Sequence, residues 1–230
     1  MQYDLIVIGA GPGGYVAAIR AAQLGLKTAV AERAEVGGTC LNRGCIPTKT
    51  LMHSANLYRE IGEAGKMGVN VTGAEADFKA MHARKAQVVE QLRGGVAQIL
   101  KGNGIDVLEG EAAFVSPESI TVGGETYTAR NFIIATGSKP AVPPIPGADL
   151  PGVVTSDEML DTDSCDYKEL VIIGGGVIGV EMAGVYNGIG RKVTIIEALD
   201  RILANMDREI SQNLSMILKK RGVAVNTGAW

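Results

Sequence analysis

The hydrophobic positions of the chain form the same strand–turn–helix–strand pattern twice. Residues 5–8 (LIVI) are a short apolar run between Asp4 and a glycine turn, which predicts a buried first strand. Residues 4–32 continue through a helical stretch to a second apolar strand, and residues 169–197 repeat this order at a constant offset of 165 without a gap. Such units place parallel strands buried on both faces. We therefore expect an α/β fold with two Rossmann-like dinucleotide-binding units.

The stretch between the two repeats predicts helices first and short strands afterwards. Residues 48–62 read as a helix after Pro47, and residues 78–101 carry a longer helical pattern. Its apolar stripe consists of Met81, Val88, Val89, Leu92, Val96, Ile99 and Leu100. Strand-like runs follow at 105–115, 119–122, 125–129 and 131–137, with a hairpin turn at Gly123-Gly124.

A connector rich in proline and glycine, residues 138–152, indicates a domain boundary. We expect one domain over residues 1–145 and a second over 146–230, with its repeat unit beginning near Lys168. A helix around 207–221 should precede the last residues. On this interpretation the second unit is incomplete at its C-terminal end.

Composition narrows the function classes. The 230 residues are 46% hydrophobic and 20% charged, which favours globular domains over disorder. The net charge of −3 gives no basic surplus for nucleic acid or an anionic membrane. Residues 5–8 lack the basic flank and length of a signal peptide or membrane span. We expect a cytoplasmic protein, and structural disulfides are rare in that compartment.

Both repeats carry the spacing G-x-G-x-x-G followed by an acid 18 residues after the last glycine. The copies align Gly9 with Gly174, Gly11 with Gly176, Gly14 with Gly179, Gly25 with Gly190, and Glu32 with Glu197. In dinucleotide sites the first glycine permits the tight turn, the second lets the backbone approach the pyrophosphate, and the third lets helix and strand pack closely. The acid accepts hydrogen bonds from ribose. A duplicated scaffold without ligands is the alternative.

Glu197 also bears on the choice of the second dinucleotide. A carboxylate repels a 2′-phosphate, so the second site should prefer NAD to NADP. Arg201, four residues later, weakens that preference.

Two of the three cysteines, Cys40 and Cys45, lie in GGTCLNRGCIPTK. Residues five apart in a regular helix are about 7.5 Å apart along its axis, beyond disulfide reach, so the segment must be distorted if the pair is to close. Pro47 fits the first turn of a helix and should keep Ile46 out of it, leaving Cys45 just ahead of a helix N-terminus, which favours a thiolate. We interpret the pair as redox-active and Cys165 as an ordinary cysteine.

Other interpretations of the pair are a metal site, a structural staple and two inert buried thiols. A metal would need more ligands, and the two histidines, His53 and His82, have no paired spacing. A staple closing so short a loop would stabilise little. Inert thiols stay open.

Lys49 and Glu181 form a candidate ion pair. Glu181 aligns with Val16 of the first repeat, which we take as an inward-facing residue on the first helical turn. An acid there needs a cation, and Lys49, four residues after Cys45, is the proposed one. A solvated lysine is the alternative.

With these motifs the whole chain resembles the N-terminal part of the flavin-dependent pyridine nucleotide–disulfide oxidoreductases. GGTCLNRGCIPTKTLM is most similar to their dihydrolipoamide dehydrogenase branch. The resemblance implies FAD in the first domain and NAD in the second, with Cys45 facing the flavin, Cys40 exchanging with substrate, and Lys49 beside the flavin, paired with Glu181. The implied FAD contacts are Gly9, Gly11, Pro12, Gly13, Gly14, Glu32, Arg33, Gly38, Thr39, Cys40, Lys49, Ala112, Ala135, Thr136, Gly137 and Ser138. Those implied for NAD are Gly174, Gly176, Val177, Ile178, Gly179, Glu181 and Glu197. Ala112 stands where many relatives have glycine.

The resemblance further implies electron transfer from dihydrolipoamide, carried on the lipoyl domain of a 2-oxoacid dehydrogenase or glycine cleavage complex, through the cysteine pair and FAD to NAD. It implies a homodimer for the full-length form, and from the ligands present we expect no metal. Family members also have a C-terminal domain that supplies a His–Glu base, so we expect this chain to be inactive alone. The alternatives are a related disulfide or metal-ion reductase, or a catalytically incomplete flavin-binding fragment.

Overall fold

The computed structural model describes residues 2–164 and 167–229; Cys165 lies outside the described residues. By compactness the chain forms two units. Unit 1 comprises Met1–Pro47 and Ala86–Leu160, and unit 2 comprises Thr48–Lys85 and Asp161–Trp230. Both units are discontinuous in sequence, unlike the expected division at residue 145, because residues 48–85 pack with the second repeat. Compactness does not test which dinucleotide each unit binds, so the domain assignment stays a prediction.

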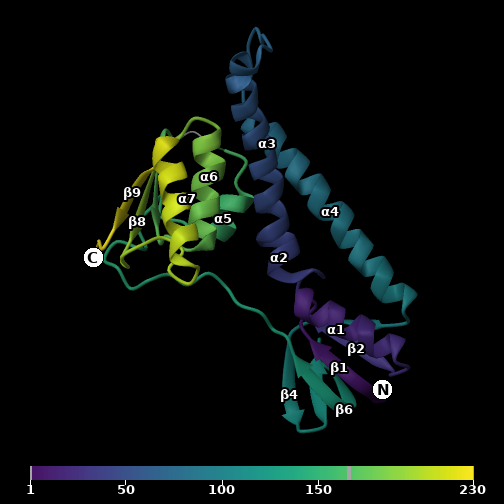
Figure 1. The fold of residues 1–230 in the computed structure, drawn as a ribbon. Helices are drawn as coiled ribbons and strands as arrows, with labels where there is room; N and C mark the ends of the chain where they lie inside the picture. Colours follow the sequence, from purple (N-terminus) through teal and green to yellow (C-terminus); the bar gives the residue numbers. More distant parts are fainter. Residues whose placement is uncertain (1, 165–166, 230) are drawn as a thin grey trace. The chain divides into compact units, whose positions relative to one another are not determined.

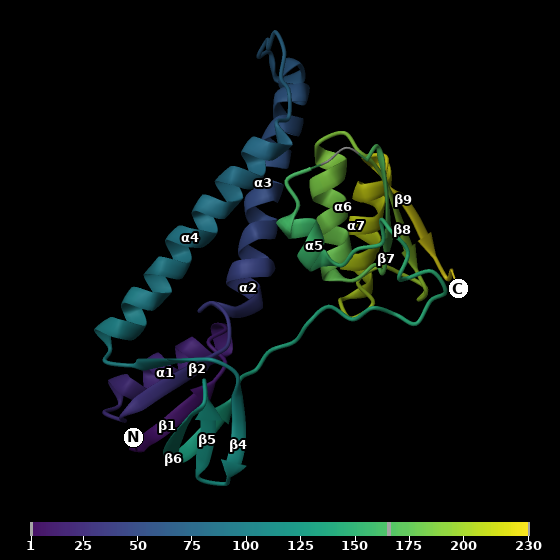
Figure 2. The ribbon, with the colours of Figure 1, turned by 180° about the vertical axis from the view of Figure 1, so that it is seen from behind.

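Unit 1 contains one six-stranded mixed sheet with the order β3-β2-β1-β6-β5-β4. Its strands are β1 (Gln2–Ile8), β2 (Thr28–Glu32), β3 (Asp106–Glu109), β4 (Ala112–Ser116), β5 (Ser119–Val122) and β6 (Glu125–Ile134). Strands β3, β2, β1 and β6 pair in parallel, whereas β4, β5 and β6 pair antiparallel, and Figure 2 shows this second group. Within the parallel half, β1 and β2 are the strands that the first repeat predicts.

The first strand is buried on both faces, as its continuous apolar run predicts. Ile6 and Val7 point to opposite faces of the sheet, and both are fully buried. Val7 packs with Ala18 of helix α1 (Pro12–Gln23) and Leu100 of helix α4 (Phe78–Gly102). Ile6 packs on the other face with Ile120 of β5. The antiparallel strands thus supply cover for one face of β1.

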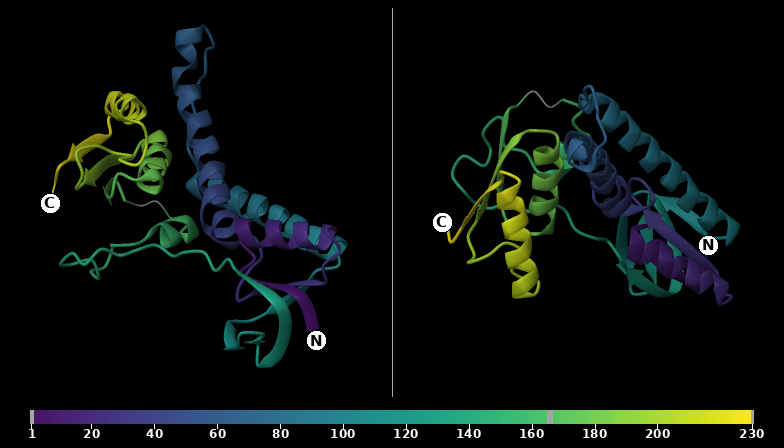
Figure 3. Two further views of the ribbon diagram at one scale, coloured as in Figure 1. Left: turned by 60° about the horizontal axis from the view of Figure 1, so that its bottom comes forward. Right: turned by 45° about the horizontal axis from the view of Figure 1, so that its top comes forward.

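Unit 2 contains a three-stranded parallel sheet, β7 (Glu169–Ile173), β8 (Lys192–Glu197) and β9 (Ala224–Thr227). Helices α6 (Val177–Gly188) and α7 (Arg208–Lys220) pack on it (Figure 3). Asp207 caps α7, because its Oδ1 accepts from the backbone N–H of Glu209 at 2.8 Å. The order β7–α6–β8 reproduces β1–α1–β2, which confirms the internal repeat.

The remaining elements largely follow the sequence pattern. The helices expected at 48–62, 78–101 and 207–221 are present as α3 (Cys45–Glu63), α4 and α7, and the connector 138–152 contains no helix or strand. Helices α2 (Gly38–Arg43) and α5 (Ser156–Asp161) and the 3₁₀ turn η1 (Ala64–Met67) complete the order (Figure 1). On α4, Leu92 and Ile99 of the predicted stripe are exposed, whereas Leu100 is buried.

Two expectations about elements were wrong. The runs 125–129 and 131–137 form mainly one strand, β6, which pairs with β5 through its first residues and with β1 through the rest. Helix α5 was not expected, although its start is capped by side chains: Glu158 Oε2 accepts from the Thr155 N–H at 2.7 Å, and Thr155 Oγ1 accepts from the Asp157 N–H at 3.3 Å. The T-x-x-E spacing was the available signal.

Candidate functional site

The first and third glycines of each repeat are required by the chain itself. Gly9 and Gly174 have φ of +101° and +106°, in the left-handed region that favours glycine. A Cβ on Gly14 would lie 1.7 Å from the carbonyl oxygen of Gly9, and one on Gly179 would lie 2.2 Å from that of Gly174. Each helix therefore packs against the turn at a distance that only glycine allows.

The second glycines are not required by the fold. Gly11 and Gly176 both have φ −72° and precede the helices that begin at Pro12 and Val177. A Cβ on Gly176 would meet no described atom within 4 Å, and one on Gly11 only the Gly38 Cα at 3.8 Å. The space before each helix N-terminus stays open, which fits a phosphate group bound to helix amides.

The two acids bind their own glycine turns in the same way. Glu32 accepts from the N–H groups of Ala10 (2.8 Å) and Ala34 (3.0 Å). Glu197 accepts from those of Gly175 (2.6 Å) and Leu199 (2.8 Å). A carboxylate has about four acceptor positions, so each acid keeps capacity for ribose hydroxyls. In this second role, which the spacing of the motif does not indicate, the acid orients the turn.

Unit 1 brings two further segments to the first glycine turn. Gly38 (φ +59°) lies so close that a Cβ on it would be 2.6 Å from the Gly11 Cα, and a Cβ on Gly9 would be 2.3 Å from the Ala135 carbonyl oxygen. Thr39 Oγ1 donates to the Ser138 carbonyl at 3.4 Å. The predicted residues 135–138 and 38–39 therefore surround the turn.

The other predicted residues of unit 1 are placed less decisively. Ala112 begins β4 and packs against the buried cluster of the sheet rather than standing open. Arg33 is exposed directly after Glu32. Neither position by itself identifies a ligand contact.

The cysteines lie on two consecutive helices that meet at Gly44. Cys40 is half-buried on α2, Cys45 is exposed as the first residue of α3, and both are thiols in this structure. A Cβ on Gly44 would lie 2.9 Å from the Thr39 carbonyl oxygen and 3.3 Å from the Cys40 Cα. The chain thus returns close to Cys40 just before Cys45, which is the distortion that the pair needs.

The start of α3 differs from expectation. Ile46 is inside the helix, and Cys45 is its first residue instead of preceding it. Pro47 is tolerated because the first-turn N–H groups have no acceptor within the helix. Cys45 still lies at the N-terminus of the helix.

The predicted pair of Lys49 and Glu181 is present in unit 2. Lys49 Nζ lies 2.5 Å from Glu181 Oε1, with the lysine side chain 56% and the glutamate side chain 23% exposed. Partly exposed pairs contribute less than about 1 kcal/mol to stability. The pair therefore serves to fix the orientation of two charged groups more than to stabilise the fold.

Comparison with known proteins agrees with this geometry. The family model for pyridine nucleotide-disulphide oxidoreductases matches residues 3–229. This chain belongs to the pyridine nucleotide-disulphide oxidoreductase family. Within the family it is 48% identical to dihydrolipoyl dehydrogenase of Thermus scotoductus over 98% of this chain and 49% of the relative. It is 47% identical to that of Acholeplasma laidlawii over 99% of this chain and 69% of the relative.

Solved structures of the family have the same fold. The copper(II) complex of the HOCl-induced flavoprotein disulfide reductase RclA from Escherichia coli superposes with a TM-score of 0.85 at 35% identity, covering all of this chain and 50% of that one. The chain spans about half the length of most of these relatives. The resemblance inferred from the cysteine motif is confirmed at the level of the family.

One premise for the ion pair in this oxidoreductase was wrong. Val16 is 55% exposed, so its position in α1 is not an inward one, and Glu181 needs a partner for a different reason. In unit 2, α3 lies against α6 through small residues: a Cβ on Gly188 would be 3.0 Å from the Ala55 Cβ. Glu181 and Gly188 are seven residues apart, which places them on one helix face, so close helix packing brings Lys49 to Glu181.

Of the two histidines in the sequence, His82 is unsuited to proton transfer at neutral pH. It is 4% exposed, packs against Phe78 at a ring-centroid distance of 4.4 Å, and neither ring nitrogen has a partner among the described residues. Burial, and then the charge of Lys85, lower the pKa of His82 to about 4, against the opposing attraction of Asp163 and Asp161. A base of that pKa is weak.

We expect His82 to make unit 2 acid-sensitive. The unfolded histidine takes up a proton near pH 6.5 and the folded one near pH 4, so stability is full above pH 6.5 and falls as the pH drops toward 4, by on the order of 3 kcal/mol. Urea unfolding at pH 7 and pH 4.5 should show that the free energy of unfolding falls less in His82→Leu than in the parent. Equal losses would contradict this, and the exposed His53→Leu is the control.

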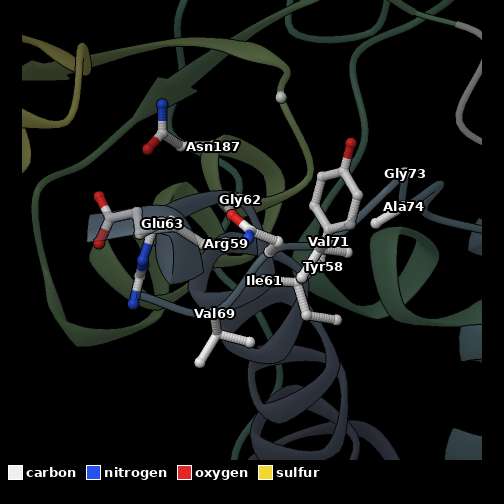
Figure 4. A pocket seen from close by; sticks show the side chains of 14 residues that line it. Tyr58, Arg59, Ile61, Gly62, Glu63, Val69, Val71, Gly73, Ala74 and Asn187 are labelled. Carbon is white, nitrogen blue, oxygen red and sulfur yellow. The ribbon is translucent and has the colours of Figure 1, made fainter. Parts of the chain in front are cut away.

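A cavity of about 600 Å³ in unit 2 lies apart from every predicted site residue. Tyr58, Arg59 and Glu63 of α3 line it together with Val69, Val71 and Asn187 (Figure 4).

In the described part of the chain no cluster of three or more His, Cys, Asp or Glu side chains could hold a metal. No helix among the described residues is long and apolar enough to cross a membrane.

Proposed function

We propose that this chain carries the dinucleotide sites and the redox disulfide of an enzyme that oxidises dihydrolipoamide with NAD. The observation that supports it most is the contact of Gly38 with Gly11. It joins the helix of Cys40 to the glycine turn of the first dinucleotide site, so a thiol pair and a cofactor cradle share one framework. The identity of 47–48% to dihydrolipoyl dehydrogenases favours lipoamide as the substrate.

The open space before each helix N-terminus fits the two cofactors. FAD would be held by Gly9, Gly11 and Gly14 at its pyrophosphate and by Glu32 at its ribose, with residues 38–39 and 135–138 around it. NAD would be held by Gly174, Gly176 and Gly179 with Glu197. Bound there, the flavin supplies a two-electron carrier between dithiol and nicotinamide.

The residues of the chain perform thiol–disulfide exchange. A thiolate of dihydrolipoamide attacks Cys40 Sγ of the Cys40–Cys45 disulfide, which breaks that bond and releases the Cys45 thiolate. The second lipoamide thiol then attacks the mixed disulfide and releases Cys40 together with cyclic lipoamide. Two electrons thereby reach the pair. Lys49, fixed by Glu181, adds a positive charge one helical turn after Cys45.

A second candidate is a disulfide reductase with another substrate. The likeness to RclA, whose structure is a copper(II) complex, supports this candidate, but at the lower identity of 35%. Oxidation of the reduced pair by lipoamide, compared with glutathione disulfide and with two equivalents of Cu(II), separates the two. The partner proposed for the first candidate is a lipoyl domain, the proposed assembly is a homodimer, and the proposed location is the cytoplasm.

Thiol labelling tests the redox role directly. After mild oxidation only Cys165 should react without reductant, and all three cysteines should react after reduction. Because the expected bond joins Cys40 and Cys45, a peptide map should find these two linked. If both react fully in the oxidised protein, the proposed function fails.

We expect the second site to bind NAD more tightly than NADP. Glu197 would repel a 2′-phosphate, and Arg201 does not offset this because its guanidinium binds the Ala204 carbonyl (2.8 Å) and Asp200 (3.2 Å). Titration with each nucleotide gives the ratio of the dissociation constants for NADP and NAD. Glu197→Gln should lower this ratio by about tenfold. Glu169→Gln removes the same charge at the opposite end of the sheet and should not change it. Tighter binding of NADP to the parent would refute the assignment.

A further inference from the structure

The loop before α2, residues 35–37, and the first residue of α2, Gly38, accept hydrogen bonds from one side-chain amide. Asn42 Nδ2 lies 3.0 Å from the carbonyl oxygens of Val36 and Gly38, and 3.5 Å from that of Glu35. The amide has two hydrogens, so three acceptors engage its whole donor capacity. The bond to Gly38 is made within α2, and the other two reach the loop.

Apart from these contacts, an asparagine at position 42 does not favour the helix. Asparagine in a helix interior competes with the backbone for hydrogen bonds. Its Oδ1 is buried and has no partner among the described residues, which carries a free-energy penalty. The side chain is nevertheless held with its donor toward the loop, so the contacts with the carbonyls decide its orientation.

The same loop forms one wall of the first glycine turn. The Gly37 N–H donates to the Ala10 carbonyl at 2.8 Å, and Gly38 packs on Gly11 so closely that a Cβ would not fit. On its outer side the Glu35 carboxylate lies 3.8 Å from Arg43 and 3.9 Å from Arg93, in partly exposed pairs that hold weakly. The Asn42 amide therefore adds side-chain hydrogen bonds from α2 to the wall, beside the backbone bond from the Leu41 N–H to the Gly37 carbonyl at 3.4 Å.

We propose that Asn42 is a positioning residue for the thiol chemistry of Cys40, which lies two residues earlier on α2. The amide fixes the first turn of α2 against the glycine turn, and this keeps Cys40 where the chain returns to it at Gly44. The proposal rests on the proposed function, since it requires that Cys40 and Cys45 form a disulfide. It adds a residue that acts through the backbone and touches no substrate.

The chemical consequence is a change in the equilibrium of the pair. In a glutathione buffer, Cys40 and Cys45 give up two protons and two electrons as their S–S bond forms, and glutathione disulfide takes them up as its S–S bond breaks to give two glutathione thiols. A fixed Cys40 has a high effective concentration toward Cys45. Loosening α2 lowers that concentration, so the disulfide becomes easier to reduce.

The test is the oxidised fraction of Cys40–Cys45 across glutathione buffers of stepped ratio, read by alkylation and mass spectrometry. Half-oxidation of Asn42→Ala should need a ratio of glutathione disulfide to glutathione about tenfold more oxidising than half-oxidation of the parent. Asn103→Ala is the matched control, because Asn103, directly after α4, also donates from Nδ2 to a carbonyl, that of Ile99 at 2.8 Å. It should leave the midpoint unchanged.

Each outcome decides the proposal. A folded Asn42→Ala protein with the midpoint of the parent would overturn it, whatever its loss of thermal stability. If Asn42→Ala does not fold, Asn42→Ser gives the same test, since a serine hydroxyl reaches only the Gly38 carbonyl within the helix. A shift of the midpoint by about threefold supports the proposal. An unchanged midpoint overturns the proposal. A parent protein that forms no disulfide would overturn the proposed function as well, which separates the two failures.

Discussion

Replacing Cys40 or Cys45 with serine is expected to abolish the uptake of two electrons per chain from dihydrolipoamide. Exchange needs a thiolate to attack and a disulfide to break, and a serine hydroxyl can supply neither at neutral pH. The oxidised parent should consume one equivalent of dihydrolipoamide, measured by titrating the thiols left in the small-molecule fraction after the protein has been removed. Each single variant should consume none, a loss of about 10³-fold or more in rate.

The two cysteine variants also differ in a way that assigns their roles. The Cys45→Ser variant keeps Cys40, which is half-buried on α2. The Cys40→Ser variant keeps Cys45, which is exposed at the start of α3. If Cys40 is the exchanging thiol, only the Cys45→Ser protein should form a stable mixed disulfide with oxidised lipoamide. Cys165→Ser is the control, with unchanged uptake. Equal consumption by parent and double variant would remove the pair from the reaction.

Gly14→Ala is expected to be among the most destabilising small substitutions in unit 1, costing about 3 kcal/mol or more of unfolding free energy. Its new Cβ would lie 1.7 Å from the Gly9 carbonyl oxygen, a backbone atom that cannot turn aside. Either α1 moves away from β1 or the glycine turn opens. Both changes also disturb the open space that we assign to the FAD pyrophosphate.

The neighbouring glycine supplies a matched control. A Cβ on Gly13 would meet no described atom within 4 Å, and Gly13 lies in the same helix. Gly13→Ala should therefore leave stability unchanged or raise it by about 0.5–1 kcal/mol, because alanine is the better helix former. Urea unfolding of the two variants measures the difference, and similar midpoints would show that the close packing at Gly14 is not essential.

The local architecture was readable from the sequence because it depends on short-range patterns. Two G-x-G-x-x-G turns between an apolar run and a helix require a tight turn and close helix packing wherever they occur, and Gly9, Gly14, Gly174 and Gly179 meet that requirement. The cysteine motif likewise indicated its family, which the comparisons confirm. The pairing of Lys49 with Glu181, 132 residues apart, followed from comparing the two repeats.

Other features needed the tertiary structure because they depend on which distant segments meet. The exposure of Val16 removed the reason first given for the ion pair, and the close approach of α3 to α6 at Gly188 supplied another. The bonds of Asn42 to the loop carbonyls depend on a chain reversal that no periodicity encodes. The sequence thus determined the glycine turns, the acids and the thiols, since their chemistry is local. Only the tertiary structure decided which groups hold them in place, because packing joins residues that are remote along the chain.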